Sequence, residues 1–295
     1  MSFSADTKAE ICKIAENNAC CKRSQLAGFV SFAGVCSEDD LKISTENAGV
    51  ARLIYTAFKE FFKISPVCDI KKFGHCHLYT NTMSGAVKVL AQIEVERAPM
   101  RIPPYVFDND CCRRAFARAA FLVSGSVTLP TKTYHMEFVT RNHKLCEDFC
   151  VLLGYFDLKA KIAIRKGCSV VYFKGSEPIL DMFALFGANN MMMQFLNTKI
   201  LKEVRNNANR LVNCETANVE KSVSASLKQV DAIKKIRERE GLESLPPGLR
   251  EVAGLRLEFP DDSLLELGER CEPVLSKSGV KHRMDKIMEI AGAYI

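Results

Sequence analysis

Residues 25–45 read QLAGFVSFAGVCSEDDLKIST, and this stretch decides the fold. It begins with a helix-length run of small and apolar residues, leaves that run at a glycine, and passes through a polar turn into a strand-like segment. Residues 117–140, ARAAFLVSGSVTLPTKTYHMEFVT, repeat the same order. Leu26 placed on Arg118, an offset of 92 residues, aligns the two stretches. The chain therefore contains an internal duplication.

The segments that follow each stretch repeat as well. Each copy continues with a helix pattern, two short strands and a closing helix. In the first copy these lie at 46–62, 66–72, 75–80 and 84–92; in the second they lie at 141–156, 158–166, 168–174 and 177–186. We predict a mixed α+β domain with two related halves.

Small residues recur at turn-to-turn spacing in the first helix of each copy, and they would let the two helices pack closely. They are Ala27, Gly28, Ala33 and Gly34 in one copy, and Ala119, Ala120, Ser124 and Gly125 in the other. Together with the order αββαββα, the nine residues 26–34, LAGFVSFAG, resemble the motif of the LAGLIDADG homing-endonuclease fold. An ordinary packed helix pair would also use small residues, but it would not repeat every element.

The sequence departs from that family at the motif positions that carry catalysis. The resemblance implies an acidic residue at the eighth motif position, where it holds a divalent metal for DNA cleavage. Here the alignment places Ala33 and Gly125 at that position, and Ser31 and Val123 at the sixth. We therefore predict no catalytic residue, no metal, no cofactor and no enzymatic activity; an active homing endonuclease is the least favoured alternative.

One strand of the second copy carries a cationic pattern. In residues 158–166, LKAKIAIRK, alternation places Lys159, Lys161 and Arg165 on one face, and Leu158, Ile162 and Ile164 on a core face. We name this cationic face as a secondary candidate for DNA binding. A charged strand face is more often simply solvated.

Composition narrows the class of protein. The 295 residues are 47% hydrophobic and 26% charged with a net charge of +6, and they contain no apolar run long enough for a membrane span and no signal-peptide pattern. We expect a cytoplasmic protein that does not bind membranes, with its thirteen cysteines reduced. The candidate metal-binding segments match no known zinc pattern: Cys20-Cys21, Cys111-Cys112, Cys146 with Cys150, and Cys68 with His75, Cys76 and His77. We expect Cys146 and Cys150, one helical turn apart in an apolar stripe, to pack in the core, and metal ligation by His75 and His77 is the less favoured alternative.

A polar, Asn-rich segment separates the duplicated region from the C-terminal region. We place the first domain at 1–205, a linker at 206–215 and a helical domain at 216–295. The third range opens with a helix pattern whose apolar face is Val219, Val223, Leu227, Val230 and Ile233.

The end of the chain predicts a helix-turn-helix. Ser263 and Glu266 form a capping box that starts one short helix, and a second helix starts at Ser276 or Ser278. This second helix would bury Val280, Met284, Ile287 and Ala291. Its other face is basic and hydroxyl-bearing, as in a recognition helix, although a solvated amphipathic helix is the alternative. The candidate DNA-binding residues are Ser276, Lys277, Ser278, Lys281, His282, Arg283 and Lys286.

Several stretches together resemble the bacterial WhiA family over essentially the whole length. They are MSFSADTKAEI at the start, RLVNCETAN at 210–218, LPPGLREVAGLRLEFPDDSLLELGE at 245–269 and LSKSGVKHRMDKI at 275–287. The resemblance implies an inactive LAGLIDADG domain followed by a helix-turn-helix domain. It also implies a nucleoid-associated transcriptional regulator that binds double-stranded promoter DNA, with a role in sporulation, cell division or chromosome segregation. The alternative is an N-terminal domain that binds a protein partner in transcription or a small effector.

Overall fold

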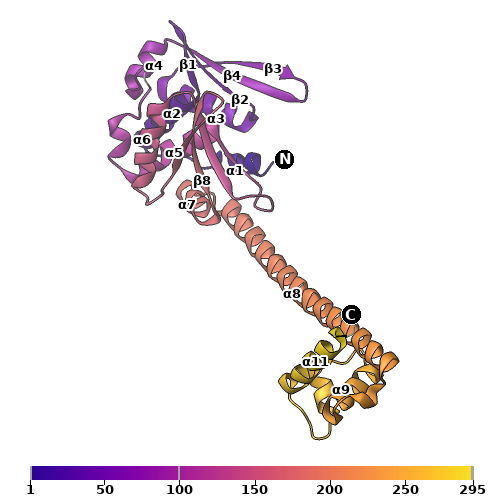
Figure 1. Cartoon of the computed structure of the whole chain (residues 1–295). Helices are drawn as coiled ribbons and strands as arrows, with labels where there is room; N and C mark the ends of the chain where they lie inside the picture. Colours follow the sequence, from indigo (N-terminus) through magenta and orange to yellow (C-terminus); the bar gives the residue numbers. More distant parts are fainter. Residues whose placement is uncertain (1, 99, 294–295) are drawn as a thin grey trace. The chain divides into compact units, whose positions relative to one another are not determined.

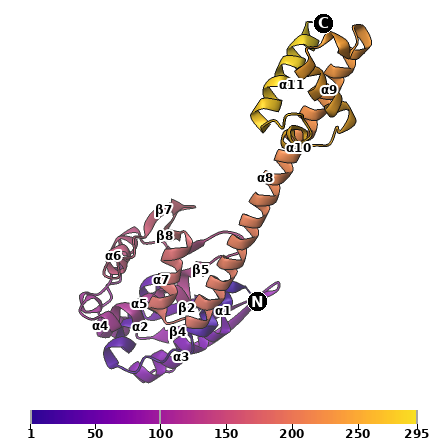
Figure 2. The same cartoon turned by 90° about the horizontal axis from the view of Figure 1, so that it is seen from below.

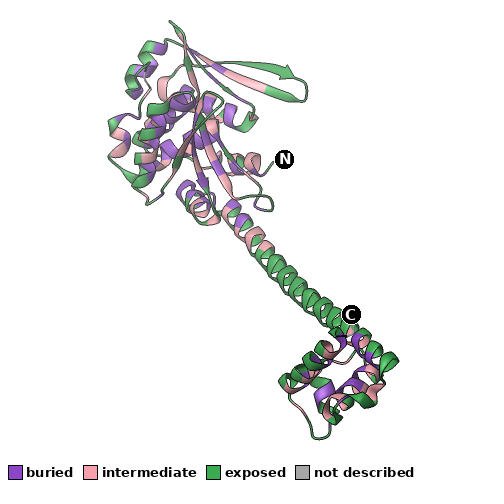
Figure 3. Ribbon diagram, viewed as in Figure 1, coloured by how far each residue is buried: buried purple, intermediate pink, exposed green. Residues whose placement is uncertain are grey.

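A computed structural model describes residues 2–98 and 100–293. The chain divides into two compact units, Met1–Glu203 and Val204–Ile295, each with its own hydrophobic core. Figure 1 shows the elements of both units, and Figure 3 shows the buried residues gathered within each. Among the described residues, no helix has both the length and the apolar character needed to cross a membrane.

The N-terminal unit is built from two halves with matching element orders, as the duplication predicts. The first half contains α1 (Phe3–Ile11), α2 (Ala19–Ala33), β1 (Gly34–Cys36), β2 (Asp40–Thr45), α3 (Ala48–Phe62), β3 (Val67–Phe73), β4 (Cys76–Ser84) and α4 (Ala86–Ile93). After the short helix η1 (Pro104–Phe107), the second half contains α5 (Asp110–Ser124), β5 (Gly125–Val127), β6 (His135–Thr140), α6 (His143–Gly154), β7 (Lys161–Arg165), β8 (Cys168–Lys174) and α7 (Ser176–Phe186).

Each half forms one four-stranded antiparallel sheet. The strand orders are β1-β2-β4-β3 and β5-β6-β8-β7, so the two sheets share one topology. The same local caps recur: Asn47 accepts a hydrogen bond from the Val50 backbone at the start of α3, and Asn142 caps α6 in the same way. The mixed α+β fold with two related halves is confirmed.

Helices α2 and α5 pack against each other at the centre of this unit, as the small residues predict. A Cβ atom added at Gly28 would lie 2.7 Å from the Ala119 Cβ and 2.8 Å from the Phe116 carbonyl oxygen. No larger residue fits there without moving a helix backbone, so Gly28 fixes how closely the two helices approach.

The structure corrects the alignment of the two halves by one residue. Both central helices have 15 residues, and each is followed by a glycine that begins a strand, Gly34 in one half and Gly125 in the other. A Cβ at either glycine would collide with the backbone of the residue four positions earlier. The two glycines are therefore equivalent, and the offset is 91 rather than 92. The similarity of Phe29 to Phe121 misled the sequence alignment, because apolar residues recur throughout both helices.

The long helix α8 (Asn189–Arg239) supplies residues to both units. Residues 206–215, where the sequence predicts a linker, lie inside this helix and are all exposed. The predicted apolar face is only partly buried: Val219, Val223 and Leu227 are 61%, 53% and 61% exposed, whereas Ile233 is fully buried. Helical spacing predicts that residues share a face, but it does not show whether another element reaches that face.

The C-terminal unit contains the last turns of α8 and a set of shorter helices. These are η2 (Leu242–Ser244), α9 (Pro247–Glu258), α10 (Leu264–Glu269) and α11 (Lys277–Gly292), which Figure 2 shows from a second side. They enclose a core that includes Ile233, Ile236, Val252 and Leu267.

Candidate nucleic-acid interface

The capping box that starts α10 is present as predicted. The Ser263 backbone N–H donates to Glu266 Oε2 at 2.7 Å, and the Glu266 N–H donates to Ser263 Oγ at 3.3 Å. The backbone N–H of Ser263 holds the pKa of the Glu266 carboxyl below its usual value. These bonds satisfy helix-end donors and fix where α10 begins.

A close contact between α10 and the following turn sets the position of α11. The Leu275 N–H donates to the Gly268 carbonyl at 2.9 Å, and a Cβ at Gly268 would lie 2.3 Å from the Leu275 oxygen. Only glycine fits at this point. Ser276 then caps α11 by accepting a hydrogen bond from the Gly279 N–H.

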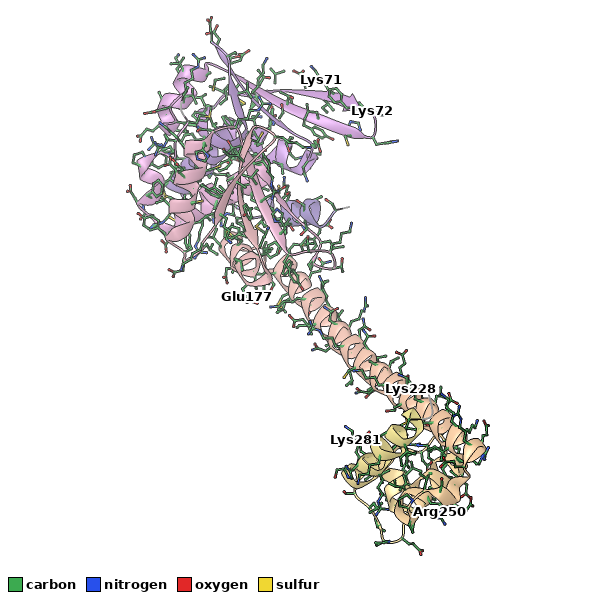
Figure 4. All side chains as sticks on the ribbon, in the orientation of Figure 1. Lys71, Lys72, Glu177, Lys228, Arg250 and Lys281 are labelled. Atoms are coloured by element: carbon green, nitrogen blue, oxygen red, sulfur yellow. The ribbon has the colours of Figure 1, made fainter. Side chains whose placement is uncertain are left out.

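The predicted division of α11 into a buried and an exposed face is confirmed. Val280, Met284, Ile287 and Ala291 are buried in the core of the C-terminal unit. Six of the seven candidate DNA-binding side chains are exposed, and Figure 4 shows Lys281 on α11. These six are Ser276, Lys277, Ser278, Lys281, His282 and Lys286.

The exposed lysines of α11 and Arg283 differ in their partners. Within the described part of the chain, Lys277, Lys281 and Lys286 make no ion pair or side-chain hydrogen bond. Arg283 is half-buried, donates to the Gly248 carbonyl at 3.2 Å and lies 3.6 Å from Glu251 Oε2. Glu251 also accepts from the Glu272 backbone N–H, so Arg283 belongs to a network that ties α11 to α9 and to the turn. The sequence could not distinguish this arginine from its exposed neighbours.

The second candidate surface is the outer face of the second sheet. Lys161 and Arg165 lie on this face as predicted, whereas Lys159 precedes β7. Arg165 is 3.3 Å from Glu137 Oε2 and lies over the Tyr172 ring, and His135 Nε2 is 3.0 Å from the same carboxylate. The prediction that Ile164 is core is wrong. It is 72% exposed and lies near the end of β7, the edge strand of its sheet.

The ends of the motif helices lack acidic side chains, as the sequence indicates. With the corrected offset, the eighth motif position holds Ala33 and Ser124, and the sixth holds Ser31 and Leu122. The Ser124 hydroxyl donates to the Ala120 carbonyl at 2.8 Å within its own helix. Beside the end of α2 lies a cavity of about 670 Å³, whose lining includes Arg97, Arg141 and His143.

One cysteine cluster has the geometry of a metal site, which the sequence did not predict. Across residues 2–98 and 100–293, one group of possible ligands has its ligand atoms close together: Cys20, Cys21, Cys111 and Cys112, all within 4.8 Å of one another. Both cysteine pairs are visible in the sequence. An offset of 92 residues does not align one pair with the other, whereas an offset of 91 does. By contrast, Cys146 is buried in the core and Cys150 is packed against it, as predicted.

Known proteins match this chain over nearly its whole length. Three family models match, described as the WhiA N-terminal LAGLIDADG-like domain (residues 19–77), the WhiA LAGLIDADG-like domain (113–205) and the WhiA C-terminal HTH domain (208–291). The relative from Alkaliphilus metalliredigens, named "Probable cell division protein WhiA", is 39% identical, with 99% of this chain and 98% of the relative covered. A relative of the same name from Clostridium botulinum is also 39% identical, with the same coverage.

Two solved structures share the fold. The crystal structure of full-length DUF199/WhiA from T. maritima aligns with a TM-score of 0.64 at 24% identity and covers 99% of both chains. The crystal structure of the N-terminal LAGLIDADG domain of DUF199/WhiA aligns with a TM-score of 0.54 at 19% identity, covering 63% of this chain and 90% of the other. These likenesses confirm the LAGLIDADG-like fold and the helical C-terminal region.

Proposed function

This chain belongs to the WhiA family, and from that premise we propose that it is a sequence-specific DNA-binding regulator of transcription. Its C-terminal domain, residues 216–295, would supply the main contacts to double-stranded promoter DNA, with 206–215 as the connecting segment. The observation that carries the proposal is the exposed face of α11, where three lysines stand without intramolecular partners among the described residues. Unpaired lysines can neutralise phosphates without first breaking an ion pair.

Each candidate residue has a proposed role that follows from its position. Ser278 and Lys281, near the N-terminal end of α11, read base edges in the major groove, where a recognition helix makes its specific contacts. Lys277 and Lys286 contact phosphates, and Ser276 and His282 flank them. Arg283 has an indirect role: its contacts with α9 hold α11 in place.

The proposed process is the control of genes for cell division, chromosome segregation or sporulation, at the nucleoid. The names of the relatives support cell division in particular. A genome-wide crosslinking map of bound sites would identify the promoters and the process.

The direct test compares DNA binding by the full chain and by Lys277→Ala/Lys281→Ala. We expect the double variant to bind promoter DNA at least about tenfold more weakly, with the slope of log affinity against log salt lower by about one unit, because Lys277 is the phosphate contact of the two. Lys221→Ala/Lys228→Ala, which removes two exposed lysines of α8, is the matched control and should bind normally. A folded double variant with unchanged affinity and slope would overturn the assignment.

The cavity beside α2 favours a second function for the N-terminal unit. Two arginines and a histidine line a space large enough for a small molecule, which would suit an anionic effector. Arg97→Ala and Arg141→Ala should then abolish effector-dependent changes in DNA affinity without changing binding by the effector-free protein. Equal responses in variant and unmodified chains would exclude this function.

A further inference from the structure

The four clustered cysteines come from the two halves of the N-terminal unit. Cys20 and Cys21 belong to α2, and Cys111 and Cys112 belong to α5. Their Sγ atoms all lie within 4.8 Å of one another, and those of Cys20 and Cys21 are 4.0 Å apart. In a tetrahedral zinc site with Zn–S bonds of about 2.3 Å, the sulfur atoms would be about 3.8 Å apart. Small side-chain rotations would bring the sulfurs to that spacing.

Each pair occupies the same place in its helix. Helix α2 begins at Ala19 and α5 begins at Asp110, so the cysteines are the second and third residues of each. The corrected offset of 91 makes Cys20 equivalent to Cys111 and Cys21 equivalent to Cys112. The pseudo-twofold relation that packs α2 against α5 therefore brings two ligands from each half to one point.

The surroundings suit a negatively charged metal–thiolate centre. Two helix N-termini meet at the cluster, and neither Asn18 nor Asn109 caps its helix with a side-chain hydrogen bond. Their backbone N–H groups and helix dipoles would stabilise thiolates. The Ser24 hydroxyl is fully buried beside the Cys112 thiol. It is placed to donate to a metal-bound sulfur, as outer ligand-shell groups do.

We propose that Cys20, Cys21, Cys111 and Cys112 bind one thiophilic divalent metal ion, Zn²⁺, in a closed structural site that joins the two halves. Four thiolates favour Zn²⁺ over the oxygen-seeking Mg²⁺, and four protein ligands leave no position for a substrate. As the ion binds, four thiols lose their protons to solvent, and no oxidation or reduction takes place. The site lies where α2 and α5 begin, whereas the degenerate motif positions lie where those helices end.

The test uses the full chain purified under reducing, oxygen-free conditions with ZnCl2 and then freed of loose metal. We expect one zinc per chain by elemental mass spectrometry. We also expect four thiols to be protected from a thiol reagent until a mercurial releases the zinc. Cobalt substitution should give the visible bands and the thiolate-to-metal charge transfer of a tetrahedral four-sulfur site.

The variant Cys20→Ser/Cys111→Ser removes one ligand from each half, at the two exposed positions, and should lower the zinc content to near zero. Its matched control, Cys68→Ser/Cys76→Ser, removes two exposed thiols of the β3-β4 hairpin and should keep one zinc. If Cys20→Ser/Cys111→Ser does not fold, the zinc affinity of the unmodified chain, measured by competition with a chelator, still tests the proposal. Four freely reactive thiols without bound metal, or a disulfide within the cluster found by alkylation of fresh protein, would overturn the proposal.

Discussion

Strand β7 and helix α11 both present cationic side chains, but the two surfaces differ in how those charges are used. On the sheet face, Arg165 pairs with the Glu137 carboxylate, which His135 Nε2 also contacts, whereas Lys161 has no ion-pair partner among the described residues. On α11, Lys277 and Lys281 are exposed and, among the residues described, have no ion-pair partner. A count of basic residues does not reveal these pairings. The partners of each side chain show that the arginine of β7 is already paired with a carboxylate, whereas the exposed lysines of α11 are not.

The largest expected effect tests whether α11 depends on its rigid support. Gly268→Ala would push a Cβ into the Leu275 carbonyl, so we expect a loss of about 2–3 kcal/mol in the stability of the C-terminal unit and loss of specific DNA binding. Thermal unfolding and binding would be measured together. Gly254→Ala, where a Cβ meets no atom within 4 Å, is the matched control and should not destabilise the unit. If the two variants behaved alike, the close contact at Gly268 would not matter.

A smaller effect separates a supporting cation from an exposed one on the same helix. Arg283→Ala breaks the bond to the Gly248 carbonyl, and we expect a stability loss of about 1 kcal/mol. The salt dependence of DNA binding should stay unchanged once the folded fraction is taken into account. Lys281→Ala should give the opposite result, with normal stability and weaker binding. A lower salt slope in Arg283→Ala would place this arginine on DNA instead.

The sequence predicted what depends on local pattern. The element order, the two halves, the capping box at Ser263 and the buried face of α11 follow from helical and strand periodicity and from cap chemistry. The sequence-based predictions failed where the burial of a residue depends on which other helix or strand packs against it. Val219 and Ile164 fit apolar faces, but both side chains are mostly exposed.

In the candidate sites too, local sequence pattern predicts some features and tertiary packing decides the others. The exposure of Lys281 follows from the helical period, whereas the bond from Arg283 to α9 depends on tertiary geometry. The cysteine cluster was missed for a different reason. A one-residue error in the repeat offset separated equivalent pairs, and glycines at the helix ends would have given a firmer reference than the apolar residues between them.

A still smaller effect tests the ion pair between Arg165 and Glu137 on the outer face of the second sheet. In the Lys277→Ala/Lys281→Ala background, Glu137→Gln would release Arg165 and His135, and we expect random-sequence DNA to bind about two- to threefold more tightly, because a partly exposed ion pair contributes less than about 1 kcal/mol. Glu38→Gln, an acid-to-amide change at an exposed residue with no ion pair among the described residues, is the control for net charge. Equal increases in both variants would show that net charge alone is responsible.

The last prediction expects no effect at all: the protein should not nick supercoiled plasmid in Mg²⁺ or Mn²⁺. Metal-dependent cleavage requires oxygen ligands that hold the ion at the scissile phosphate. Ala33 offers none, and the Ser124 hydroxyl is bonded to its own helix. The nearby acids Glu38, Asp39 and Asp40 lie in the turn after β1 and at the start of β2 rather than at the ends of the motif helices. Gel analysis of plasmid incubated with the full chain should show closed circles at the level of the buffer control. Metal-dependent nicking that persists through a second purification and disappears in Ser31→Ala/Ser124→Ala would show that this unit has kept a nuclease centre built from hydroxyls.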